Sequence, residues 1–292
     1  DEAMKIYATY DGIREVTMDA LMLENMEITF VVAEKQICAI LLTEPAKIEN
    51  IRVLLLENDN MFRSDVSLVS DVPVHLYYGE TETVLEAGSV ITASNYANIL
   101  ATSSISLVAE DGTSPFYFTD NQGNRISPAY AGSMELRMYP EGYTVVNVVD
   151  LESYVKGVIP SEVPSSYGME ALKAQAVCAR SYAYIQMMHN KYEAYGAHVD
   201  DSVNFQVYNK QNQTLETVAA VDETKGQVLS YKGDIIETYY YSTSYGHTGD
   251  YEAWNLDKDA YGYLQGVWVR SEENPIDLSD EKSFLDYISG VD

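Results

Sequence analysis

A single glutamate stands between two prolines in the stretch VIPSEVP, residues 158–164, just ahead of a long and nearly uncharged segment. Proline fixes its own φ and pushes the preceding residue toward extended backbone, so Pro160 and Pro164 predict a stiff linker around Glu162. A carboxyl group held in this way can act first as a general acid and then as a general base. The simpler alternative is an acid that flanks a helix or joins an ion pair, and the local residues leave both open.

Two cations follow in the helical segment, Lys173 and Arg180. They are seven residues apart, so they lie within about 20° of each other on one helix face. An unpaired charge in a dry core costs several kcal/mol, which means that both must meet acids or open onto a polar cleft. The face is therefore either a set of structural ion pairs or the floor of a groove beneath Glu162.

The remaining candidate motifs are weaker. The four histidines lack a short metal-binding spacing and the two cysteines are far apart, so a structural zinc site is not expected. The stretch DKDAYG, from Asp257, imitates the start of a calcium loop, but its twelfth position is Trp268 rather than Glu, and we discard it. YYYSTSYGHTG, residues 239–249, is either an ordinary polar turn or the lip of a sugar site.

Composition excludes several classes of partner. With 18 Lys+Arg against 45 Asp+Glu among 292 residues, the net charge of -27 opposes binding to nucleic acid and to anionic lipid surfaces. The longest apolar runs, such as ICAILL and VVNVV, have the length of strands and are too short to span a membrane. The opening DEAMKIY has neither basic nor apolar signal regions, so the sequence either lacks a targeting segment or begins after one.

The elements expected around these residues indicate an α+β fold, with a helical catalytic core packed on antiparallel β structure. Residues 1–47 predict a small β-rich N-terminal domain, with strands at KIYATY, EITFVV and QICAILL and a brief helix at TMDALMLEN. Residues 48–270 predict a second domain, and residues 271–292 a tail that ends in a short helix, DEKSFLDYIS, and that a longer protein could continue.

The second domain divides into three parts. Alternating segments at about 51–140 predict antiparallel strands. Residues 145–200 predict a short helix with Asp150 as its N-cap, then a main helix from about residue 168 to 192 after a Ser165-Ser166 cap. Residues 203–270 predict closing strands at FQVY, GQVLSY and IETYYYSTS, with a hairpin turn at Lys232-Gly233.

The helical stretch VVNVVDLESYVKGVIPSEVPSSYGMEALKAQAVCARSYAY resembles the signature region of the stage II sporulation protein D family. The similarity resumes in FQVY, VDETKGQVLSY and YYYSTSYGHT, so it covers about residues 51–268. The family comprises exported, usually membrane-tethered proteins that cleave peptidoglycan glycan strands as lytic transglycosylases and prefer strands stripped of stem peptides. Related members are known as enhancers of a cell-wall amidase.

The resemblance assigns roles to individual residues. Glu162 matches the catalytic glutamate of the family, and Lys173 and Arg180 match its required basic residues, which would make their helix face the floor of a groove. The serine-rich motif matches residues 242–248, although Tyr245-Gly246 stands where the family usually has Gly-Gly and Gly249 where it has Glu, so the rim of the site is expected to differ. Further groove contacts would come from Gln206, Ser242 and Ser244.

The resemblance also bears on cofactors. Some members bind zinc through two cysteines and two histidines just before the QVY motif, where this chain has Asp200, Asn204 and Phe205 in place of Cys, His and Cys. We therefore expect neither a metal site nor any other cofactor.

The implied function is that of a lytic transglycosylase that cleaves glycan strands beyond N-acetylmuramic acid and leaves 1,6-anhydro ends. The rival is a non-catalytic wall-binding module that activates an N-acetylmuramoyl-L-alanine amidase. Both functions imply peptidoglycan strands as a partner, and the rival function also implies an amidase. Both imply a location outside the cell or on a membrane facing the wall. The residues do not decide between a role in sporulation and one in vegetative growth.

Overall fold

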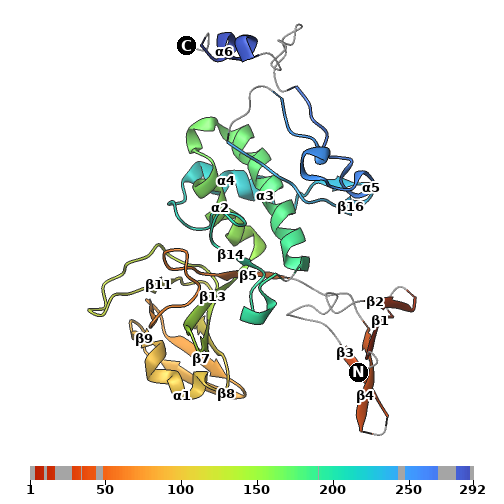
Figure 1. The fold of residues 1–292 in the computed structure, drawn as a ribbon. Helices are drawn as coiled ribbons and strands as arrows, with labels where there is room; N and C mark the ends of the chain where they lie inside the picture. The colour runs from red at the N-terminus through yellow and green to blue at the C-terminus, as the bar shows by residue number, and fades with distance from the viewer. Residues whose placement is uncertain are drawn as a thin grey trace. The chain divides into compact units, whose positions relative to one another are not determined.

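The computed structural model describes residues 4–9, 12–16, 28–33, 35–43, 49–189, 191–242, 247–268 and 281–289. Its contacts divide the chain into two compact units, Asp1–Tyr239 and Tyr240–Asp292, each of which is described by itself. The first unit holds the sheets and the helices α1 to α4 (Figure 1). The mixture of separate sheets and helices confirms the expected α+β class.

Among the described residues of the N-terminal part, four strands form one sheet in the order β2-β1-β4-β3. Strands β1 and β4 are parallel, and the other pairs are antiparallel. Ile6, Ile40 and Leu42 form its small core. The strands are β1 (Lys5–Ala8), β2 (Arg14–Val16), β3 (Ile28–Ala33) and β4 (Gln36–Leu42). Strands β1, β3 and β4 match the expected strands, and β2 was not predicted. The helix predicted at residues 17–25 lies outside the described residues.

The largest sheet among the described residues has the strand order β14-β5-β13-β12-β10-β7-β8. All of its pairs are antiparallel except β14 with β5. Burial alternates along β10, where Ile105, Leu107 and Ala109 point into the core, as the two-residue period of a strand requires. The strands are β5 (Asn50–Leu54), β7 (Val74–Tyr78), β8 (Thr81–Leu85), β10 (Ile105–Ala109), β12 (Ser133–Tyr139), β13 (Gly142–Asp150) and β14 (Val199–Asp200).

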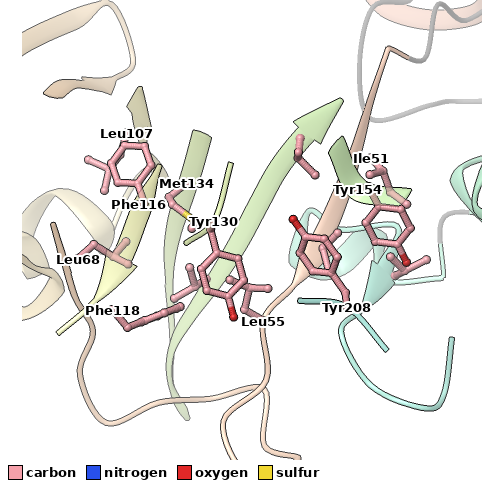
Figure 2. Packing of buried hydrophobic residues seen from close by; sticks show 14 of the residues in the cluster. Ile51, Leu55, Leu68, Leu107, Phe116, Phe118, Tyr130, Met134, Tyr154 and Tyr208 are labelled. Carbon is pink, nitrogen blue, oxygen red and sulfur yellow. The ribbon is translucent and has the colours of Figure 1, made fainter. Parts of the chain in front are cut away.

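A smaller sheet, in the order β11-β6-β9, contributes to the same hydrophobic core. Figure 2 shows Leu68, Phe116, Leu107 and Met134 grouped at this part of the core, with Tyr130, Tyr208 and Tyr154 in a row beside them. Its strands are β6 (Ser67–Ser70), β9 (Ile91–Thr92) and β11 (Phe116–Phe118), and the four-residue helix α1 (Ala97–Leu100) follows β9 and a short 3-10 turn.

Three helices, α2 (Leu151–Glu162), α3 (Met169–His189) and α4 (Leu215–Glu223), lie side by side in Figure 1. The Asp150 side chain caps α2 by accepting from the Ser153 N–H, which confirms the predicted N-cap. A capping box formed by Thr214 and Thr217 begins α4. The main helix α3 follows a 3-10 turn at Ser165–Tyr167, and its small buried residues let neighbouring helices approach closely.

Salt bridges join the three helices. Lys156 of α2 pairs with Asp222 at 2.7 Å, and Lys173 of α3 pairs with Glu223 at 2.7 Å and with Glu170 at 3.1 Å. Two acids at the end of α4 therefore each hold a lysine of a different helix. The Lys173 side chain is 26% exposed, and hydrogen bonding to Glu223 and then to Glu170 raises the pKa of its ammonium group.

Arg180 makes the most deeply buried of the helix-joining pairs described. Its Nε and Nη2 donate to the two carboxylate oxygens of Glu152 at 2.9 and 2.7 Å, and its side chain is 2% exposed. Its other N–H groups donate to the carbonyl oxygens of Val221, Gln227 and Ala176. Glu152 also accepts from the Gly226 N–H at 3.0 Å. One guanidinium therefore ties the first turn of α2 and the end of α4 to α3.

This geometry corrects the expectation that Arg180 lies on an open groove floor. The two cations do share one face of α3, but that face is turned toward α4 and toward Glu152. Because Arg180 is buried among its partners, it fits the ion-pair alternative that the sequence left open.

Two of the closing strands predicted after α3 are not strands. Residues 205–208, FQVY, form a loop, and residues 236–242 have no strand. Strands β15 (Ser230–Tyr231) and β16 (Asp234–Ile235) do form the hairpin predicted at Lys232-Gly233. The alternation in FQVY reflects side chains that pack into the core from a loop rather than from a sheet.

The second unit contains a 3-10 turn at Tyr251–Trp254, helix α5 (Lys258–Tyr261) and helix α6 (Glu281–Ser289). Helix α6 matches the predicted C-terminal helix, and α5 occupies the segment that imitates a calcium loop. Within the described parts of the chain, no helix is both long enough and apolar enough to cross a bilayer.

His198 is buried beside the edge strand β14. Its imidazole Nδ1 accepts from the backbone N–H of Arg52 at 3.1 Å, and the backbone N–H of His198 donates to the Arg52 carbonyl oxygen. Burial, and secondarily the charge of Arg52, lowers the pKa of His198 to about 4. The imidazole is therefore neutral in the folded protein at pH 7.

We predict that this histidine makes the fold acid-sensitive. The unfolded chain binds the proton of this histidine more tightly than the folded protein does. The contribution of neutral His198 to the free energy of unfolding is therefore complete above pH 6.5, and it falls by about 3 kcal/mol as the pH drops to 4. In His198→Asn, which can accept from Arg52 but cannot titrate, this component should vanish. Urea unfolding across pH 4 to 7.5 measures it, with exposed His189→Asn as the control. A constant stability difference between wild type and His198→Asn would refute the assignment.

We also predict that Arg180→Ala destabilises the fold by about 3–5 kcal/mol, because it leaves the partly buried Glu152 carboxylate without its cationic partner. Lys173→Ala should cost far less, since its ion pairs are more exposed. Chemical denaturation of both variants measures the difference, and a double-mutant cycle with Glu152→Gln isolates the pair. An Arg180→Ala protein with wild-type stability and lost glycan binding would restore the groove interpretation.

Candidate active site

Glu162 is the last residue of α2, not part of a linker as the two prolines suggested. Pro160 lies inside the final turn, where it removes one backbone donor without ending the helix. Val163, the C-cap residue that follows the helix, has an extended backbone (φ -133°, ψ 127°), which is the conformation expected before Pro164. The candidate carboxylate is therefore positioned by the end of a buried helix.

The half-buried carboxylate of Glu162 accepts a hydrogen bond from the Val207 N–H, with Oε1 2.7 Å from the nitrogen. The C-terminal end of a helix carries partial negative charge, which disfavours a carboxylate there. The N–H group offsets this cost and fixes one of the two oxygens. The orientation of the Glu162 carboxylate is thus set by a backbone N–H group from another part of the chain.

The loop that supplies Val207 is bound to the end of α2 at several further points. The Ser161 hydroxyl oxygen accepts from the N–H groups of Lys210 and Gln211, and donates to the Gly157 carbonyl oxygen. The Asn209 N–H donates to the same carbonyl at 3.0 Å. Residues 207–211 therefore follow the last two turns of α2 closely.

The start of this loop is held by two buried acids. Asp200 accepts from the Ser202 N–H and hydroxyl, from the Tyr192 hydroxyl and from the Asn204 amide. Asp201 accepts from the Leu56 N–H at 3.0 Å and from Lys210 Nζ at 2.6 Å. Asp200 and Asn204, at the positions for which the resemblance suggested zinc ligands, thus hold the loop through hydrogen bonds.

The expected absence of a metal site stays a prediction. Within the part of the chain that the structure describes, no cluster of three His, Cys, Asp or Glu side chains has a geometry suited to an ion. The donors around Asp200 are hydroxyl and amide groups, already engaged with its carboxylate, and thiolate ligands of the kind that hold structural zinc are missing from this stretch.

Three further residues were predicted as groove contacts: Gln206, Ser242 and Ser244. Gln206 is 1% exposed, and its Nε2 donates to the Ala179 carbonyl oxygen of α3 at 3.3 Å, so its side chain joins the loop to the helix. Ser242 is exposed and belongs to the second unit. Ser244 lies outside the described residues.

Sequence reasoning missed the groups that orient the glutamate. Glu152 gave a signal only as an acid in the first turn of α2, and Ser161 was simply the residue before Glu162. Val207 acts through its backbone N–H, so its side-chain type carries no signal. Only the QVY motif itself, taken as a strand, marked this part of the chain.

Comparisons with known proteins agree with this architecture. Residues 139–231 match the family model of the stage II sporulation protein, SpoIID. A protein of Brachyspira hyodysenteriae without an assigned function is 40% identical over 139 residues, which is 47% of this chain and 37% of that protein.

Two proteins of Bacillus subtilis are also similar. One, named Amidase enhancer, is 29% identical over 232 residues, covering 65% of this chain and 32% of its own length. The other, named Stage II sporulation protein D, is 36% identical over 161 residues, covering 48% and 46%. The match thus spans less than half the length of each of these relatives. Residues 139–231, which hold α2, α3, α4 and the loop that contacts Glu162, are thus similar to the stage II sporulation protein D family.

Proposed function

We propose that this protein is a peptidoglycan lytic transglycosylase in which Glu162 is the catalytic acid and then the catalytic base. The observation that carries the proposal is the Glu162 carboxylate itself, fixed at the end of α2 by the Val207 N–H within the family-matched region. A carboxyl group can exchange protons with a substrate only if it is held within about 2.6–3.2 Å of the reacting oxygens. A helix end bound by a loop offers that rigidity.

The proposed reaction needs one carboxyl group. Glu162 gives its proton to the glycosidic oxygen as the bond from that oxygen to the anomeric carbon of N-acetylmuramic acid breaks. The carbon-6 hydroxyl oxygen of the same sugar bonds to the anomeric carbon, and its proton passes to Glu162. The products are a free hydroxyl on the leaving sugar and a 1,6-anhydro end, and no water is consumed, unlike in hydrolysis by paired carboxylates.

The neighbouring residues take different parts in this proposal. Lys173, whose side chain is partly exposed, and Ser242 and Ser244 are proposed contacts for sugar or lactyl oxygens. Arg180 and Gln206 are buried, so they would act by holding the helices and the loop rather than by touching a glycan. The substrate would be peptide-stripped peptidoglycan, and the protein would work outside the cell or on a membrane facing the wall.

A second function has its own support. The relative named Amidase enhancer is similar over 65% of this chain, so a role as a non-catalytic, wall-binding activator of a cell-wall amidase is the alternative proposal. Both functions include glycan binding. Only the formation of anhydro ends separates them.

We predict that Glu162→Gln binds stripped glycan strands as the wild type does but yields no 1,6-anhydro ends, because the amide keeps the shape and cannot donate or accept the catalytic proton. Glu162→Asp, with its carboxylate drawn back by one methylene, should lose most turnover. Mass spectrometry of digested strands measures the products, and the exposed Glu193→Gln is the matched control. Anhydro ends formed at near wild-type rate by Glu162→Gln would refute this mechanism.

The wild-type protein decides between the two proposals in the same assay. If it forms no anhydro ends but stimulates a purified N-acetylmuramoyl-L-alanine amidase, the activator function replaces the enzymatic one.

A further inference from the structure

Gly157 lies in the middle of α2, where it is buried against the ring of Tyr208. A Cβ atom at position 157 would come within 2.5 Å of Tyr208 Cε2 and 2.9 Å of Cδ2. Non-bonded contacts this short are essentially never made by a Cβ atom, so the ring packs directly on the helix backbone because the side chain is absent. A glycine inside a helix costs about 0.5–1 kcal/mol relative to alanine, which makes this close approach a specific use of it.

Tyr208 is fixed at its other end by a hydrogen bond. Its hydroxyl donates to Asn147 Oδ1 at 2.8 Å, and Asn147 Nδ2 donates to the carbonyl oxygens of Ala131 and Ser133. Because both amide hydrogens are used, the orientation of the Asn147 oxygen toward Tyr208 is set. Burial raises the pKa of Tyr208, so the hydroxyl stays protonated and remains a donor.

The ring also stacks in the core. Figure 2 shows Tyr208 between Tyr130 and Tyr154, and its ring centroid lies 4.9 Å from that of Tyr154 at an interplanar angle of 27°. The side chain is 2% exposed. Its position is therefore determined from three directions: the helix backbone, the asparagine and the stacked rings.

The two residues beside Tyr208 make the backbone contacts to α2. The Val207 N–H donates to Glu162, and the Asn209 N–H donates to the Gly157 carbonyl oxygen. A displacement of the Tyr208 ring that shifts its own backbone also shifts both neighbours, since they are joined to it through single peptide units. The packing of the Tyr208 ring on Gly157 thus sets the position of the loop along the helix that carries the candidate carboxylate.

We propose that Tyr208, seated on Gly157, is a positioning residue that holds the Val207 N–H against the Glu162 carboxylate. The catalytic consequence rests on the proposed function, but the positioning itself does not. Tyr208 would not touch the glycan, and it would act only by fixing one oxygen of the acid.

A purely structural role for Tyr208 in the core would also lower stability on mutation, so melting temperature cannot test the proposal. The discriminating signal is the Val207 amide proton, whose chemical shift should follow the ionisation of the carboxylate it contacts. In protein labelled with ¹⁵N-valine, Val207→Ile identifies the resonance and Glu162→Gln identifies the part of its pH dependence that comes from Glu162.

Gly157→Ala is the decisive variant, because alanine favours the helix while its Cβ displaces the ring. We expect it to lose most of the Glu162-dependent shift of Val207 and to lower turnover about 10²-fold, the effect of a misplacement of roughly 1 Å. Tyr208→Phe keeps the ring on its seat and loses only the bond to Asn147, so it should retain most of the shift. Phe116→Leu, a change at a buried ring elsewhere in the same core, is the matched control and should leave the shift intact.

Two outcomes would overturn the proposal: a Gly157→Ala protein whose Val207 resonance titrates as in the wild type, or equal losses in Gly157→Ala and Phe116→Leu. If instead the shifts change as expected but wild-type protein forms no anhydro ends, the positioning stands and the proposed enzymatic function fails. The two conclusions are therefore separable within one set of proteins.

Discussion

The buried pair between Arg180 and Glu152 is the constraint on which the helical part of the molecule depends. Taking both charges out of water costs several kcal/mol for each ion, and only near-complete hydrogen bonding makes such a pair tolerable. Here the guanidinium meets both carboxylate oxygens and three backbone carbonyls, and Glu152 gains a further N–H from Gly226. The donors and acceptors match in one arrangement of α2, α3 and the end of α4, so the pair favours that arrangement over others.

With its first turn fixed in this way, α2 transmits position along its length. A helix is stiff over twelve residues, so an anchored start at Asp150 and Glu152 defines where the end at Glu162 lies. The end is then held independently by residues 207–211 through Ser161, Gly157 and Glu162 itself. The candidate carboxylate thus belongs to an element restrained at both ends, which is the preorganisation that proton transfer requires.

Several elements of the fold could be predicted from the sequence, because their short-range sequence patterns agree with the tertiary structure. The Asp150 cap, the Lys232-Gly233 hairpin and the terminal helix at residues 281–289 were all predicted from neighbouring residues and are confirmed. The shared face of Lys173 and Arg180 was also predicted, but its environment was not. Helix periodicity says which side chains lie together, whereas the partner Glu152 is 28 residues away from Arg180, and a single sequence gives no sign of that pairing.

The candidate site was harder to predict for a physical reason. Pro160 was read as a helix end, although a proline in the last turn removes only one hydrogen bond while packing of α2 retains the helix. The FQVY segment was predicted as a strand, yet its Val207 N–H bonds a side chain, not a neighbouring strand. Backbone groups that serve a site leave no trace in residue type, so their roles appear only when the chain is folded.

In the folded protein, the KGVIPSE and FQVY motifs contact each other. The glycine in KGVIPSE leaves the space that the tyrosine in FQVY fills, and the residue before that tyrosine reaches the glutamate that ends the first motif. Residues 163–204 separate the two motifs, with all of α3 between them, and α3 is held to α2 by the Arg180 pair. The first turn of α2, the buried ion pair and the loop after β14 therefore act on one carboxylate, and a change in any of them moves the same group.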